Sequence, residues 1–172
     1  FLRNTSRKNL DCHNLTSLIS LSRLDLSSNL IETIKTDSFK FKDKIFLQTL
    51  YLRNNLIRFI EKDSFKYLTN LIRFNIDNNL FENQDQIENI NFGNFYSLSE
   101  LSMVNSKLTK LPLFDSNSII KNKFKLRILK LSFNQIESIS ALYFNLPNLS
   151  HLDLSNNRIS RIDSTNVFSL TP

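Results

Sequence analysis

Residues 149–162, with the sequence LSHLDLSNNRISRI, contain the pattern that decides the fold. Leucine occupies its first, fourth and sixth positions, asparagine its ninth, and isoleucine its eleventh and fourteenth. Residues 21–34, LSRLDLSSNLIETI, repeat it closely. Counting looser variants, copies begin at residues 21, 47, 71, 98, 126 and 149, at spacings of 26, 24, 27, 28 and 23 residues. Six copies in phase indicate a repeat architecture in which each copy stacks on the next.

The apolar fourth and sixth positions of each copy predict a short β-strand. Alternate side chains of a strand point to opposite faces, so these positions point inward and the third, fifth, seventh and eighth face outward. One copy cannot bury its apolar face alone. Stacked copies therefore predict a parallel sheet that lines one concave surface.

An asparagine recurs at the ninth position, where the chain must turn away from the strand. Its amide group can both donate to and accept from turn backbone that would otherwise be buried and unpaired. We expect a ladder of Asn29, Asn55, Asn79, Asn134 and Asn157. Ser106 takes this position in the fourth copy. Its shorter side chain, with a single donor, predicts a weaker or differently turned repeat there.

A second apolar set follows each strand and closes the return limb of the repeat. Its members are Ile34, Phe39 and Phe41; Ile60, Phe65 and Leu68; Phe92 and Phe95; Leu111 and Ile120; Ile139, Phe144 and Leu146; and Ile162, Phe168 and Leu170. These positions explain much of the count of 15 phenylalanines. We expect a stacked phenylalanine spine in the core rather than an aromatic ligand site.

The consensus of residues 149–162 and 21–34 resembles the typical, roughly 24-residue class of leucine-rich repeat. That class occurs in Toll-like receptor ectodomains, chaoptin-like adhesion proteins and Slit-like guidance proteins. The resemblance covers nearly the whole chain, although copies three and four depart from it in length and at Ser106. It implies an α/β repeat solenoid: a leucine-rich repeat horseshoe with a parallel concave β-sheet and irregular or short helical convex limbs.

The domain organisation follows from the same pattern. The 172 residues fit one leucine-rich repeat domain, residues 1–172, with a partial repeat at 2–20 before the six copies. Leu2 lies 24 residues before Leu26, as expected if the chain starts inside an earlier strand. Neither end carries a convincing polar cap, which a solenoid needs on its terminal repeats. We therefore expect a fragment of a longer solenoid.

Three glycosylation sequons, at Asn4, Asn14 and Asn148, fit the extracellular repeat class. We expect an extracellular or cell-surface location through the secretory pathway, with a cytoplasmic location as the alternative. The only cysteine, Cys12, lies in a stretch (residues 11–18) that loosely resembles a cysteine-bearing N-terminal cap. Such a cap needs partner cysteines, so a buried free thiol is the favoured interpretation.

The sequence predicts no catalysis. Its two histidines, His13 and His151, lie near opposite ends of the solenoid, and the chain has a single glycine. We find no metal-ligand spacing, nucleophile elbow or phosphate-binding loop. We expect no enzyme activity, no cofactor and no bound metal.

The outward strand positions are the candidate binding surface. The selected residues are Tyr51, Arg53, Arg73, Asp77, Lys130, Phe133 and His151. Tyrosine and arginine often anchor protein interfaces, so Tyr51, Arg53 and Arg73 on neighbouring strands predict a hot spot. Alternatively, Arg53 and Asp77 form a surface ion pair of little energetic value. Val104, Ile128 and Phe133 form either an exposed partner patch or a partly buried kink, and we favour burial.

The chain has a net charge of +6, and much of the basic excess falls on return limbs. These lysines are Lys40, Lys42, Lys44, Lys62, Lys66, Lys121, Lys123 and Lys125. Aligned in a lateral strip, they would attract nucleic acid, glycans or acidic membrane surfaces, although a solvated limb is the favoured interpretation. The long insertions near residues 82–94 and 115–125 are a second candidate for lateral contacts.

The sequence thus predicts a non-catalytic module for protein or glycan recognition, within an extracellular leucine-rich repeat receptor or adhesion protein. A protein ligand or co-receptor is the expected partner, and membrane contact is expected only through parts outside this chain. The alternatives are an intracellular leucine-rich repeat scaffold and a purely structural spacer in a larger assembly.

Overall fold

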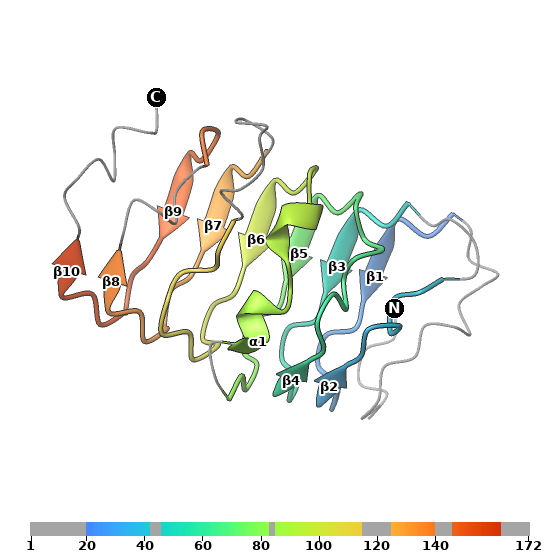
Figure 1. Ribbon diagram of the computed structural model, residues 1–172, viewed down its shortest axis with the longest axis horizontal. Coiled ribbons are helices and arrows are strands. Elements are labelled where there is room, and N and C mark those ends of the chain that lie inside the picture. Colours follow the sequence, from blue (N-terminus) through green and yellow to red (C-terminus); the bar gives the residue numbers. More distant parts are fainter. Residues whose placement is uncertain (1–19, 42–45, 83–84, 115–124, 140–145, 163–172) are drawn as a thin grey trace.

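The computed structural model describes residues 20–41, 46–82, 85–114, 125–139 and 146–162. It is an elongated solenoid whose six main strands lie side by side in chain order (Figure 1). The strands are β1 (Arg23–Asp25), β3 (Thr49–Tyr51), β5 (Arg73–Asn75), β6 (Glu100–Ser102), β7 (Ile128–Lys130) and β9 (His151–Asp153). All neighbouring pairs are parallel. The predicted parallel-sheet solenoid is confirmed, while the partial repeat at 2–20 lies outside the described residues.

The strand register follows the sequence copies. The central residues, all at the fourth position, pair across the sheet: Leu24, Leu50, Phe74, Leu101, Leu129 and Leu152. The first five are buried, and Leu152 packs against the core while partly exposed. Because side chains alternate along a strand, burial of this row turns its flanking residues to the opposite face of the sheet.

The residue at the eighth position has a left-handed backbone in every copy. Ser28, Asn54, Asn78, Asn105, Phe133 and Asn156 have φ between 50 and 57°. Asparagine tolerates this conformation better than most residues other than glycine, and it occupies four of the six sites. In the fourth copy Lys107 also has a positive φ, of 58°, which no other described copy shows at that position. The turn that contains Ser106 is therefore different, as predicted.

The predicted asparagine ladder is confirmed. Asn55 Nδ2 donates to Leu52 O in its own repeat (2.9 Å) and to Leu26 O in the preceding one (3.0 Å). Its Oδ1 accepts from the backbone N–H of Ile31 at 3.1 Å. Asn79, Asn134 and Asn157 make the same types of bond to the repeats before them.

Ser106 replaces only part of this arrangement. Its hydroxyl donates to Val104 O at 3.1 Å and, at a long 3.4 Å, to Ile76 O of the preceding repeat. In the neighbouring copies the asparagine also accepts a hydrogen bond from the backbone N–H of the eleventh residue of the preceding copy, as Asn79 does from Ile57 and Asn134 from Leu108. Phe81 is the equivalent donor for Ser106, and the described hydrogen bonds include none between them. Ser106 therefore retains a weak hydrogen bond as a donor to the preceding repeat, but it does not replace asparagine as an acceptor.

The return limbs contain the predicted phenylalanine spine. Phe65 stacks on Phe39 with ring centroids 5.2 Å apart, and it also contacts Phe74 at 5.2 Å. Phe95 packs edge-on against Phe74 at 5.9 Å and Phe92 at 6.0 Å. All five side chains are buried. Phe144 and Phe168, predicted to extend the spine, lie outside the described residues.

Two short parallel pairs lie outside the main sheet, below its strands in Figure 1. β2 (Thr33–Ile34) pairs with β4 (Phe59–Ile60), and β8 (Ser138–Ile139) pairs with β10 (Arg161–Ile162). Ile162 is 52% exposed, so the expectation that it closes its repeat is wrong for the described chain. No described repeat packs on its far side.

The insertion near residues 82–94 forms α1 (Asp85–Glu88) and the 3₁₀ turn η2 (Phe92–Asn94). Figure 1 shows α1 beyond β4, on the side away from β2. Ile60 N–H of β4 donates to Gln86 Oε1 at 2.7 Å, and Asn89 Nδ2 donates to Ile60 O at 2.8 Å. Two side chains thus satisfy backbone groups that another strand would otherwise pair. This gives the insertion a structural role that its length alone did not reveal.

A membrane-spanning helix would need a long apolar stretch, and no helix among the described residues has one.

Candidate functional site

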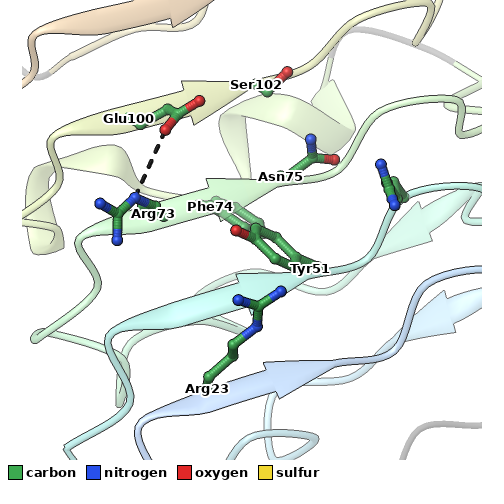
Figure 2. A pocket seen from close by; sticks show the side chains of 8 residues that line it. Arg23, Tyr51, Arg73, Phe74, Asn75, Glu100 and Ser102 are labelled. Carbon is green, nitrogen blue, oxygen red and sulfur yellow. Dashed lines mark ion pairs between the residues drawn. The ribbon is translucent and has the colours of Figure 1, made fainter. Parts of the chain in front are cut away.

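The outward face of the main sheet contains a pocket of about 290 Å³ near its N-terminal end (Figure 2). We call it the arginine pocket. It is lined by Arg23, Tyr51, Arg53, Arg73, Phe74, Asn75, Glu100 and Ser102. These residues come from β1, β3, β5, β6 and the turn after β3. The strand register brings together Tyr51, Arg53 and Arg73, the three residues of the predicted hot spot.

Tyr51 lies between cationic side chains of adjacent strands. The Arg23 guanidinium lies 4.8 Å from the centroid of the Tyr51 ring, a cation–π distance. Figure 2 shows the Tyr51 ring extending from β3 toward β5. Tyr51 is partly buried, which limits its rotamers. Sequence reasoning missed the Arg23 contact, because it depends on the rotamer that Arg23 adopts.

Glu100 links two of the predicted cationic residues. Its carboxylate lies 3.8 Å from Arg73 Nε and 3.0 Å from Lys130 Nζ, which joins β5, β6 and β7 on the outward face. The three side chains are partly exposed, so the pairs contribute little to stability. Figure 2 shows the ion pair between Arg73 and Glu100 among the side chains that line the pocket.

The alternative ion pair between Arg53 and Asp77 does not form: no ion pair within the described ranges joins them. The Asp77 carboxylate instead accepts from Asn75 Nδ2, Ser102 Oγ and Val104 N, each at 2.7 Å. Three donors satisfy both of its oxygens. Asp77 therefore braces the turns of repeats three and four, and Arg53 remains exposed in the pocket lining.

Phe133 lies on the surface, 59% exposed, with φ of 57°. The expectation that Phe133 is partly buried at a kink is therefore wrong, whereas Val104 and Ile128 are indeed half-buried. The reason is the left-handed turn after each strand, which directs the eighth residue outward. A bulky side chain is unusual in that conformation.

A second asparagine ladder lies on the surface beside the buried one. Asn78 Nδ2 donates to Asn54 Oδ1 at 2.7 Å, and Asn105 Nδ2 donates to Asn78 Oδ1 at 2.9 Å. In the next copy Phe133 takes this place. The recurrence of asparagine at the eighth position was the available signal in the sequence.

The last described strand of the main sheet, β9, holds His151, which is exposed. Next to it on the same face, the pKa of the Asp153 carboxyl is held below its usual range, chiefly by the hydroxyl and then the backbone N–H of Ser155. Both donate to Asp153 Oδ1, at 2.7 and 3.0 Å. His151 is on β9, three strands beyond β5, so it is not part of the arginine pocket.

The lateral features are only partly described. Lys40, Lys62, Lys66 and Lys125 are exposed, and Lys66 lies over the Tyr67 ring at 5.0 Å. Four further residues of the predicted strip lie outside the described residues: Lys42, Lys44, Lys121 and Lys123. Alignment of the strip therefore stays a prediction.

The sequon residue Asn148 is exposed, while Asn4, Asn14 and Cys12 also lie outside the described residues. Within the described ranges, no cluster of three or more His, Cys, Asp or Glu side chains could hold a metal ion.

Comparison with known proteins agrees with this architecture. A family model described as "Leucine Rich repeats (2 copies)" matches residues 125–166. Leucine-rich repeats are thus matched at residues 125–166, the described part of the chain forms a solenoid of the same kind, and leucine-rich repeat domains generally bind proteins. A search of curated proteins gave no match.

Among solved structures, TLR13 in a TLR13–ssRNA13 complex resembles the chain with a TM-score of 0.74 and 23% identity, over 94% of this chain and 21% of that one. A leucine-rich repeat protein of Leptospira interrogans gives 0.65 and 25%, over 90% and 39%. The leucine-rich repeat domain of APL1B gives 0.54 and 19%, over 99% and 58%. The fold thus resembles that of a Toll-like receptor ectodomain, and the chain spans only part of each of these proteins.

Proposed function

We propose that this chain is a non-catalytic recognition module of an extracellular leucine-rich repeat receptor or adhesion protein, and that it binds a protein partner through the outward face of the main sheet. The observation that carries the proposal is the arginine pocket. It gathers three arginines and a tyrosine, the residue types that most often dominate protein–protein binding energy.

The pocket is built on strands that a packed core holds in place. Leu50, Phe74 and Leu101 lie beneath it with at most 1% of their surface exposed. Backbone hydrogen bonds of 2.8 Å, such as Leu26 N–H to Tyr51 O and Leu52 N–H to Asn75 O, tie the adjacent strand ends together. A partner would therefore meet a largely preformed surface, which reduces the entropy lost on binding.

Binding can be tested with the purified, tagged chain applied to intact cells of the source organism. We expect saturable surface binding that Tyr51→Ala or Arg53→Ala weakens at least tenfold. Lys62→Ala, an exposed change on a return limb, is the matched control and should bind as the wild type does. Mild protease treatment of the cells should remove the binding. Absence of saturable binding, or equal loss in the control, would contradict the proposal and favour a structural spacer.

The proposed location has a separate test. The exposed sequon at Asn148 and the repeat class both support passage through the secretory pathway. The intact mass of protein from its native source should fall by the mass of a glycan after glycosidase treatment. An unchanged mass, together with Cys12 as a free thiol, would favour an intracellular scaffold.

A further inference from the structure

We propose that the arginine pocket binds the carboxylate of a single acidic side chain on the protein partner. This inference rests on the proposed function and names the chemistry that the partner must present. It depends on how charge is distributed over the sheet face, residue by residue.

The positive charge of the pocket is not neutralised by its own lining. Three arginines face one carboxylate, that of Glu100, which is shared between Arg73 and Lys130 at 3.8 and 3.0 Å. In the described part of the chain, Arg53 makes no ion pair. Its guanidinium is therefore available to a ligand.

The two aspartates beside the pocket are turned toward donors of the sheet itself. Asp77 accepts three hydrogen bonds of 2.7 Å. Asp25 is buried, and its Oδ1 accepts from Ser27 N–H at 3.1 Å. Because both oxygens of Asp77 accept hydrogen bonds and Asp25 is buried, the two aspartates compete weakly for Arg53, and a carboxylate from outside can replace water there.

The chemistry of the lining suits a carboxylate. A guanidinium presents two parallel N–H donors that match the two oxygens of a carboxylate. The Tyr51 ring, with Arg23 against it at 4.8 Å, forms a wall that reduces water access and strengthens the pairing. The volume of about 290 Å³ accommodates the end of one side chain and not a folded element.

A polyanion fits this face less well. Its arginines lie on β1, in the turn after β3 and on β5, whereas Glu100 and Asp153 lie further along on β6 and β9, and Lys130 of β7 is paired with Glu100. A nucleic acid or sulfated glycan that followed the sheet would bring successive negative groups against these carboxylates. One isolated acidic side chain avoids that repulsion.

The test is an NMR titration of the purified chain with the peptide acetyl-Gly-Glu-Gly-amide, observing the arginine Nε–H resonances. We expect saturable shifts at Arg53 and its pocket neighbours, with acetyl-Gly-Gln-Gly-amide causing none. Arg53→Gln should weaken binding of the Glu peptide at least tenfold. Tyr51→Phe, which keeps the ring, should weaken it by less than Arg53→Gln.

The matched control is Arg58→Gln, which removes an exposed arginine that pairs with Glu82 at 3.7 Å outside the pocket. It should leave binding of the Glu peptide unchanged. Equal shifts with the Gln peptide, uniform shifts of all arginines, or tighter Arg53-dependent binding of a heparin octasaccharide would overturn the inference. If cell binding persists while the peptides fail, only this inference is wrong. If the Glu peptide binds but cells do not, the proposed function fails.

Discussion

Asparagine has two separate roles at the eighth and ninth positions of the repeat, and the second, third and sixth copies have it at both. At the eighth position its tolerance of a positive φ replaces glycine, of which the chain has one. At the ninth position its amide joins buried backbone groups of neighbouring repeats. Asn78 and Asn79 illustrate the pair, since the first is exposed and the second is 1% exposed.

Asn79→Ala should lower the free energy of unfolding by about 3 kcal/mol, because Ile57 N–H and several carbonyls lose a buried partner. Asn78→Gly is the control: glycine accepts the backbone conformation, and only exposed hydrogen bonds are lost, so about 0.5 kcal/mol is expected. Urea unfolding of the two variants measures both values. Similar losses would show that the buried ladder has no special role.

Phe133 occupies a conformation that suits a smaller residue. Phe133→Asn should raise the free energy of unfolding by about 1 kcal/mol, because a left-handed backbone costs most non-glycine residues about 1–2 kcal/mol. Leu113→Asn, at a site that is 50% exposed without a positive φ, should change it by less than about 0.5 kcal/mol. Thermal unfolding of both variants is the measurement, and a destabilised Phe133 variant would refute the argument.

At the scale of elements, α1 completes β4 with side chains instead of a strand. Gln86→Ala should remove the acceptor of the Ile60 amide N–H. The protection of the Ile60 amide against hydrogen exchange should then fall by at least tenfold. The Glu61 amide, bonded to Ile34 O at 2.9 Å, should keep its protection.

Glu88→Ala, an exposed change on the same helix, is the control for that experiment. It should leave the exchange of Ile60 unchanged. Equal effects of the two substitutions would mean that α1 as a whole, and not the Gln86 side chain, protects the strand.

At the scale of the whole molecule, each repeat is stabilised by its neighbours. Phe65, in the second copy, contacts Phe39 of the first copy and both Phe74 and Phe95 of the third. Phe65→Ala should cost about 4 kcal/mol and lower amide protection in β1, β3 and β5 more than in β9. Ile162→Ala, at an exposed site, should cost less than about 1 kcal/mol. Uniform loss of protection would mean that the solenoid unfolds as a single unit.

The sequence predicted those features that depend on periodicity. The strand positions, the buried asparagines and the phenylalanine spine recur with the repeat, so each copy supports the others. The same register brought Tyr51, Arg53 and Arg73 together in the pocket.

The features that were missed depend on competition among side chains. Asp77 could pair with Arg53 or accept hydrogen bonds from three nearby donors, and in the structure it accepts the hydrogen bonds. Residues 82–94 fall outside the repeat register, so no pattern indicated that Gln86 and Asn89 would bind Ile60. Phe133 is at the eighth position, which the repeat pattern assigns to the outward face, so its exposure follows the pattern, and burial was wrongly favoured because the residue is apolar.

The hydrogen bonds from Gln86 and Asn89 to β4 affect how molecules of this protein associate in solution. An open edge strand presents unpaired N–H and C=O groups on which a strand of another chain can grow, and this is a common start of aggregation. At Ile60 both groups are already bonded to Gln86 and Asn89. At Ile60 the edge of β4 therefore has no unpaired backbone group to which a strand of another molecule could bond. This edge is protected there against self-association by strand pairing.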